Sequence, residues 1–172
     1  SGTSDNLITW QYDALGRTTQ KASLLGTLIY GYDGNSGRLV SSAFPGSGLA
    51  SLYEYFGSSG LRRLKKIAYA RANALTSVIS SREYTYQPGG NIATWKRTNG
   101  LTDTITTYGY DAADQLLTAL TAATATPSVT AETLGYSYDR AGNRQSEQRD
   151  AALAGFTFNN LNQVQSRNGG GG

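Results

Sequence analysis

One short phrase recurs seven times along this chain of 172 residues. It reads aromatic, any residue, aromatic, and then a polar turn that leads into a new segment. The seven copies begin at Trp10, Tyr30, Tyr53, Tyr84, Tyr108, Tyr136 and Phe156. Their second aromatics follow at irregular intervals, at Tyr12, Tyr32, Tyr55, Tyr86, Tyr110, Tyr138 and Phe158. A constant phrase at irregular intervals predicts a constant turn whose copies are joined by connections of variable length.

Each phrase is typical of a β-hairpin. In the first copy Asp13 suits the first position of a type I turn, and Gly16 supplies the left-handed residue that follows it. Where this glycine is missing, Asp114 and Asn162 stand in its place, and Asp and Asn tolerate positive φ better than most residues. We therefore predict structural turn roles for a set of aromatic, aspartate and glycine residues. They are Tyr12, Asp13, Gly16, Tyr32, Asp33, Gly37, Tyr110, Asp111, Tyr138, Asp139 and Gly142.

Some copies depart from this pattern. The second and third carry one extra residue before Gly37 and Gly60, which predicts turns that are one residue longer. The turn aspartate is replaced by Phe56, Gln87 and Asn159 in three copies. We expect those three turns to be held by glycine or asparagine alone.

The composition agrees with an all-β fold, because 21 Gly favour turns and 12 Tyr favour pleated strands. The stretches 61–75 and 112–125 have helix-compatible spacing, but the repeat places Leu61 and Leu116 at the start of return strands. We predict consecutive antiparallel β-hairpins that form a curved spiral sheet or a small closed β unit. The predicted boundaries are a single β domain over 1–168 and a Gly-rich tail or linker over 169–172.

Catalytic chemistry has few candidates in this sequence. The chain contains no Cys, Met or His, which excludes disulfides, a thiol nucleophile, the usual triad base and the commonest zinc ligands. The repeat already explains four aspartates as turn formers, so the remaining candidates are scattered glutamates. These are Glu54, Glu83, Glu132 and Glu147. We predict no enzyme activity, no catalytic residues, no metal site and no cofactor.

Binding is the stronger alternative. Trp10 and Trp95 are candidate glycan-binding residues that could stack on sugar rings, although the inter-hairpin aromatic ladder explains them as well. Four basic residues form a cluster at Arg62, Arg63, Lys65 and Lys66. With a net charge of only +3, we interpret this cluster as a solvated strand edge rather than a nucleic-acid site. No apolar run approaches the roughly 20 residues needed to cross a bilayer, so we predict no membrane span.

Three segments, 12–17, 32–39 and 138–144, resemble the YD repeat of the Rhs family, in which tyrosine and aspartate precede a glycine turn. The resemblance extends from about Trp10 to Val164. In that family the repeats form a spiral of hairpins that closes into a hollow shell. Its members include the cocoons of bacterial insecticidal toxin complexes, Rhs toxins of interbacterial competition, and teneurins of animal cell surfaces.

The resemblance implies a structural role. It predicts a segment of a secreted or cell-surface shell that encloses or presents a toxin or effector, with the rest of a larger Rhs-type chain or its cargo as partner. The alternative is a carbohydrate-binding or adhesive module. Asp-Pro motifs like the self-cleaving site of bacterial Rhs cores are absent from this sequence. Open strand edges near 9–12 and 163–167 also predict self-association.

Overall fold

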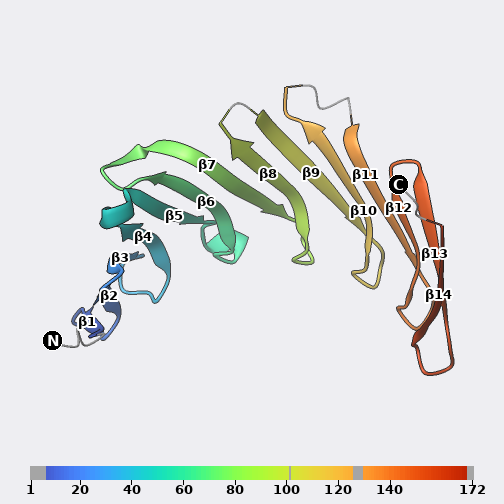
Figure 1. Ribbon diagram of the computed structural model, residues 1–172, viewed down its shortest axis with the longest axis horizontal. Helices are drawn as coiled ribbons and strands as arrows, with labels where there is room; N and C mark the ends of the chain where they lie inside the picture. Colours follow the sequence, from blue (N-terminus) through green and yellow to red (C-terminus); the bar gives the residue numbers. More distant parts are fainter. Residues whose placement is uncertain (1–6, 101, 126–129, 170–172) are drawn as a thin grey trace, which may run out of the picture. The chain divides into compact units, whose positions relative to one another are not determined.

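The computed structural model describes residues 7–100, 102–125 and 130–169, and within them the all-β prediction is confirmed. Figure 1 traces the strands in chain order. The first seven are β1 (Thr9–Tyr12), β2 (Thr18–Ser23), β3 (Gly26–Tyr32), β4 (Leu39–Phe44), β5 (Leu49–Tyr55), β6 (Leu64–Arg71) and β7 (Ala74–Tyr86). The next seven are β8 (Ile92–Asn99), β9 (Thr102–Tyr110), β10 (Leu116–Ala123), β11 (Thr130–Tyr138), β12 (Arg144–Arg149), β13 (Ala152–Phe158) and β14 (Val164–Gly169). Two 3-10 turns accompany them, η1 (Pro45–Ser47) and η2 (Ser58–Gly60).

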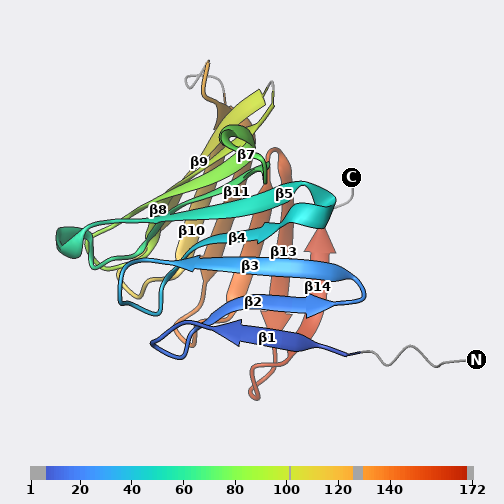
Figure 2. The same cartoon turned by 90° about the vertical axis from the view of Figure 1, so that its left-hand side faces the viewer.

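The strands follow one another in the sheet in the order of the chain, each antiparallel to the next. Figure 2 shows this order most clearly for β1 to β5. Each of the seven phrases lies at the turn from an odd-numbered strand to the even-numbered strand after it. The predicted series of consecutive antiparallel hairpins is therefore confirmed. No helix forms in the two stretches where local propensity allowed one, because 61–75 contains β6 and the start of β7, and 112–125 contains β10.

The chain divides into two compact units, Ser1–Glu83 and Tyr84–Gly172. The single domain over 1–168 stays a prediction. Gly169, which we assigned to the tail, is the last residue of β14 and pairs with Ala154. Residues 170–172 lie outside the described part of the chain.

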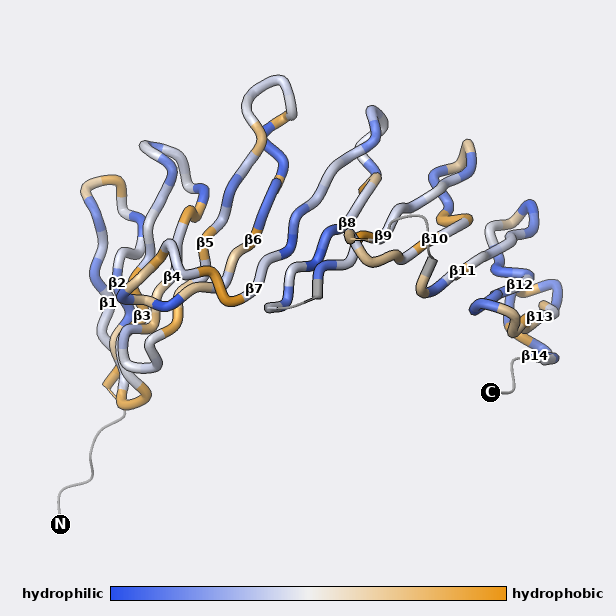
Figure 3. Tube along the Cα trace, turned by 90° about the horizontal axis from the view of Figure 1, so that it is seen from above, coloured by the Kyte–Doolittle hydropathy of each residue, from blue (hydrophilic) through white to orange (hydrophobic). Residues whose placement is uncertain are grey.

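Both units bury small side chains rather than large ones. In the described residues no large side chain is fully buried, and the buried positions are Ala50, Ala68, Ala70, Ser81, Thr106, Ala119, Thr121, Ala122 and Ala154. Figure 3 shows hydrophilic and hydrophobic positions interleaved along the hairpins. In the first unit, Ala43, Ala50 and Ala70 lie opposite one another on neighbouring strands. Because side chains alternate along a strand, Tyr53 and Tyr55 of β5 project from the opposite face to Ala50. Each unit is thus a sheet with half-buried side chains on its faces rather than a layer over a thick core.

The same irregularity of pairing recurs beside the phrase turns. In six hairpins the register shifts by one residue at the second aromatic, which is paired with the first residue of the return strand. These pairs are Tyr12 with Thr18, Tyr32 with Leu39, Tyr55 with Leu64, Tyr110 with Leu116, Tyr138 with Arg144 and Phe158 with Val164. A bulge of this kind increases twist and re-aims the side chain beside it.

The second turn has the predicted extra residue. The backbone N–H of Asp33 donates to the carbonyl of Arg38, whereas Asp13 in the first turn donates to Arg17, one position closer. However, the left-handed glycine of the second turn is Gly34, with φ +51°, rather than Gly37. Both turns close with the same bond, because the N–H groups of Gly16 and Ser36 donate to the carbonyls of Asp13 and Asp33 at 3.0 Å, so the extra residue of the second turn lies after this bond and Gly37 falls outside the left-handed position.

The prediction for the third turn is wrong. The backbone N–H of Phe56 donates to the carbonyl of Arg63 at 2.9 Å, so this loop is longer than predicted and contains η2. Its left-handed residues are Leu61 (φ 55°) and Arg62 (φ 53°), neither of which is glycine. Leu61 therefore belongs to the loop and not to the return strand, which begins at Leu64.

Candidate functional site

Three of the four turn aspartates, Asp13, Asp111 and Asp139, bind the backbone of their turns, whereas the carboxylate of Asp33 pairs with the Arg38 guanidinium. One carboxylate oxygen, Oδ1 of Asp13, accepts hydrogen bonds from the backbone N–H groups of Leu15 (2.9 Å) and Arg17 (3.0 Å). Asp111 and Asp139 make the same pair of bonds two and four residues ahead. Asn159 does so with its amide oxygen, at 2.9 and 3.0 Å. An amide oxygen can thus replace the carboxylate as acceptor, which explains the asparagine in the seventh copy.

Two of these aspartates are further stabilised in their charged form. The side-chain hydrogen bond from Arg17 lowers the pKa of Asp13 below its usual value of 3.8. The side-chain hydrogen bond from Asn143 does the same for the pKa of Asp139. Backbone N–H donors add to both shifts, since they favour the carboxylate over the neutral acid.

The second tyrosine of a phrase joins its hairpin to the preceding hairpin. The Tyr32 hydroxyl donates to the backbone carbonyl of Thr18 at 2.7 Å, and Tyr55 donates to Leu39 at 2.8 Å. In the second unit Tyr110 donates to Ile92 and Tyr138 to Leu116, both at 3.0 Å. Each acceptor is the first residue of the return strand one repeat earlier. We call this contact the tyrosine lock.

The sequence contained a signal for the lock that we did not use. Six of the seven second aromatics are tyrosine, whereas the first aromatics include Trp10 and Phe156. The hydroxyls of the first tyrosines Tyr30 and Tyr53 bond to no residue in the described part of the chain, because they extend from a different position of the strand. When the second aromatic is nearly always tyrosine and the first aromatic varies, the pattern indicates that the hydroxyl at the second position has a hydrogen-bond partner.

Charged side chains reinforce the lock in the first unit. Arg17 pairs with Asp13 at 2.7 Å, and its guanidinium lies 4.6 Å from the ring centre of Tyr32 in the next hairpin. It also donates to the carbonyls of Gly34 and Ser36 in the next turn. The contact is repeated one hairpin later, where Arg38 pairs with Asp33 at 2.9 Å and lies 5.2 Å from the ring centre of Tyr55. A guanidinium from one turn therefore covers the locking ring of the next.

In the second unit amide side chains connect successive turns. Asn91 donates to the carboxylate of Asp114 at 2.7 Å, and Asn143 donates to the side-chain oxygen of Asn162 at 3.0 Å. Asp114 and Asn162 are the left-handed residues that we predicted in place of glycine, with φ 60° and 58°. These two residues therefore set the conformation of their own turns and also accept a hydrogen bond from the turn of the preceding repeat.

The two candidate glycan-binding tryptophans have different surroundings. Trp10 on β1 is 47% exposed, with the Lys21 ammonium 4.8 Å from its ring centre. On β8, the indole Nε1 of Trp95 is buried and has no hydrogen-bond partner among the described residues, and the Arg97 guanidinium lies 4.8 Å from the ring centre. Trp10 thus offers a more accessible ring than Trp95.

The candidate carboxylates are each paired with a cation. Glu54 lies 3.7 Å from Lys65, Glu83 3.2 Å from Lys66, Glu132 3.3 Å from Arg149 and Glu147 3.2 Å from Arg144. Two of these cations, Lys65 and Lys66, belong to the basic cluster identified in the sequence.

Among the described residues there is no grouping of acidic side chains that could hold a metal ion. The described helices include none that is long and apolar enough to span a membrane.

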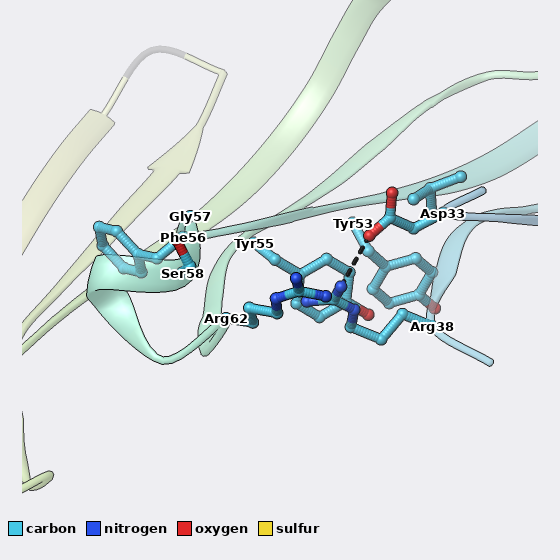
Figure 4. Close-up of a pocket in the computed structure, with 9 residues that line it drawn as sticks. Asp33, Arg38, Tyr53, Tyr55, Phe56, Gly57, Ser58 and Arg62 are labelled. Carbon is cyan, nitrogen blue, oxygen red and sulfur yellow. Dashed lines mark ion pairs between the residues drawn. The ribbon is translucent and has the colours of Figure 1, made fainter. Parts of the chain in front are cut away.

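A pocket of about 430 Å³ lies in the first unit, between the β3–β4 turn and the β5–β6 loop. Figure 4 shows its lining, with Asp33 and Arg38 from the turn, Tyr53 and Tyr55 from β5, and Arg62 from the loop. Val40 and residues 56–58 complete it. It was not predicted from the sequence, because the third turn was expected to be too short to carry Arg62 over this position.

No protein-family model matches the chain, and no curated protein matches it. Solved structures do match, each over 93% of this chain. One is the Tc holotoxin pore of Photorhabdus luminescens with the mutation TccC3-D651A, at 15% identity and a TM-score of 0.34. The others are the crystal structures of TcdB2-TccC3, at 15% and 0.34, and of TcdB2-TccC3-Cdc42, at 13% and 0.35. The chain spans only 13 to 14% of the length of these solved chains.

Proposed function

We propose that this chain is a wall segment of a secreted or cell-surface shell of the Rhs type, built from YD repeats, and that the shell encloses or presents a toxin or effector polypeptide. The observation that carries the proposal is the tyrosine lock. Because each lock joins one hairpin to the preceding one, the repeat can continue from hairpin to hairpin with the same contact. A structure of this kind extends a surface rather than enclosing an active site.

Burial supports the same function. A sheet whose buried residues are Ala, Ser and Thr has no thick core of its own, and its stability depends on hairpin pairing and on contacts between neighbouring hairpins. Within each unit, tyrosine and leucine side chains lie half-buried or exposed on the sheet, which gives it an amphipathic surface. Such a surface suits a wall that faces water on one side and polypeptide on the other.

We also propose that the chain has no enzymatic activity of its own. Its glutamates are held in ion pairs, and the turn aspartates Asp13, Asp111 and Asp139 are engaged with backbone N–H groups. A general base needs an available carboxylate beside a reacting group. Turnover of a substrate that survives Glu54→Gln and Glu83→Gln but is abolished by another single substitution would contradict this proposal.

Protease protection tests the shell function. In a full-length chain that contains this segment, the enclosed polypeptide is expected to resist a protease that digests it rapidly when it is expressed alone. Tyr32→Phe together with Tyr110→Phe, which removes one lock from each unit, should increase the digestion of the enclosed polypeptide. The paired control is Tyr12→Phe, which removes an exposed hydroxyl without a partner among the described residues. If the polypeptide were digested at the same rate within the full-length chain as when it is expressed alone, enclosure would be excluded.

The exposed ring of Trp10 favours the alternative, a carbohydrate-binding or adhesive module. A glycan array on the folded protein separates the two functions. Binding that is lost in Trp10→Ala or Trp95→Ala would support the alternative. Self-association also stays a prediction: β1 and β14 stand at the two ends of the strand order, and light scattering across a concentration series would detect pairing of such edges.

A further inference from the structure

We infer that the pocket between the β3–β4 turn and the β5–β6 loop binds the carboxylate of an acidic sugar, such as a uronic acid. This site is independent of the shell function. Its volume of about 430 Å³ is within the range of small-ligand pockets, and all of its lining belongs to the first unit.

The charge of the pocket selects a singly charged anion. Its ionised lining residues are Asp33, Arg38 and Arg62. Arg38 is paired with Asp33 at 2.9 Å, which neutralises one cation, whereas Arg62 has no carboxylate partner in the described part of the chain. In Figure 4 the Arg62 side chain extends toward Arg38. The remaining single positive charge matches one carboxylate, and a guanidinium fork binds a carboxylate through two parallel hydrogen bonds.

The backbone of the loop places Arg62 at this position at an energetic cost. Leu61 and Arg62 both adopt left-handed conformations, with φ 55° and 53°, although neither is Gly, Asn or Asp. Strain of this kind is found preferentially at functional positions. Arg62 is also exposed, so burial of the side chain does not account for the conformation.

The rest of the lining suits a sugar. The hydroxyls of Tyr53 and Ser58 form no hydrogen bond with the described residues, so both are available to a ligand. Tyr55 has its hydroxyl bonded to Leu39 at 2.8 Å, and this bond holds the ring in place. Because the Arg38 guanidinium covers the Tyr55 ring, the aromatic contact with a sugar falls to Tyr53, whose large ring with a polar tip suits a half-wet recognition surface.

Titration of the folded protein with a glucuronate-terminated oligosaccharide tests the site. We expect binding that the glucose-terminated counterpart lacks and that added salt weakens. Arg62→Asn should reduce the affinity at least about tenfold, because a charge-assisted hydrogen bond is lost. Asparagine tolerates positive φ, so the same variant should unfold at an equal or higher temperature. Arg140→Ala, which removes an exposed turn arginine of the second unit, is the matched control and should bind like the unchanged protein.

Four results of these titrations would overturn the inference, and a fifth, from a peptide titration, would reassign the pocket. They are the absence of glucuronate binding, equal binding of the neutral sugar, equal affinity in Arg62→Asn, and tighter binding of inorganic phosphate. A short peptide that binds through its terminal carboxylate more tightly than glucuronate would likewise assign the pocket to peptides instead of sugars.

Discussion

The hydroxyl of Tyr32 reaches out of its own hairpin and donates to the backbone carbonyl of Thr18, 2.7 Å away in the preceding one. Thr18 begins β2, and Tyr32 ends β3 beside a bulge. The bulge contributes to this hydrogen bond, because the register shift changes the direction of the Tyr32 side chain and turns its ring toward the preceding hairpin. The same geometry at Tyr55, Tyr110 and Tyr138 makes this one contact the repeating link between hairpins.

Removal of one lock should have a measurable cost. Tyr32→Phe keeps the ring but removes the donor to the Thr18 carbonyl, so we expect a loss of about 0.5–1.5 kcal/mol in the free energy of unfolding. The measurement is urea unfolding. Tyr12→Phe is the control, because Tyr12 is 60% exposed and its hydroxyl has no partner among the described residues. If both variants lost the same free energy, the lock would not be a specific contribution.

The sequence predicted the hairpins well because their determinants are local. The turn residues and the alternation of aromatic side chains act over a few positions, and the left-handed roles of Gly16, Asp114 and Asn162 follow from intrinsic φ preferences. The third loop was not predictable in this way, since Leu61 and Arg62 adopt a conformation that their own preferences oppose. The lock and the pocket were missed for a related reason: both depend on which residues of neighbouring hairpins come together.

Acid should weaken the fold through the turn aspartates. Hydrogen bonds from Arg17 and Asn143 lower the pKa of Asp13 and of Asp139 in the folded protein below the usual value of 3.8. Above that value the carboxylates are charged in both states and the stabilisation is fully present. As the pH falls below it, the unfolded chain takes up protons first, so stability decreases until the folded carboxyls are protonated as well.

Unfolding midpoints measured from about pH 5 to about pH 2 would follow this loss. The double variant Asp13→Asn, Asp139→Asn should show a smaller decrease over this range, because an amide cannot be protonated there. Asn159 already shows that an amide oxygen can accept the same two backbone bonds. An unchanged acid dependence in the double variant would mean that other carboxyls cause it.

The conformation of Gly16 should be required for the first turn. Its φ is +75°, and a Cβ built there has no atom within 4 Å, so a substitution is penalised by the backbone angle rather than by a clash. Gly16→Val is expected to cost more than about 1 kcal/mol, and Gly16→Asn less.

Gly37 offers a matched control in the second turn. It also has open space around its Cβ position but does not have a positive φ, so Gly37→Val should remain within about 0.5 kcal/mol of the unchanged protein. Thermal melting compares the three variants. Equal tolerance of valine at Gly16 and Gly37 would contradict the assignment of left-handed positions.

The seventh hairpin should accept a lock that it does not have. Phe158 occupies the position of the locking tyrosine, beside the same register shift, but has no hydroxyl. The preceding locks all use the carbonyl of the first residue of the return strand one repeat earlier, which for Phe158 is Arg144 at the start of β12. Phe158→Tyr should therefore create a hydroxyl donor to the Arg144 carbonyl and stabilise the protein by about 0.5–1.5 kcal/mol.

Phe156→Tyr is the matched control. The corresponding Tyr136 has no hydroxyl bond within the described part of the chain, so this change should alter the free energy of unfolding by no more than about 0.5 kcal/mol. Urea unfolding distinguishes the two, and a gain that is absent from Phe158→Tyr, or equal in both variants, would show that position in the repeat does not determine the lock.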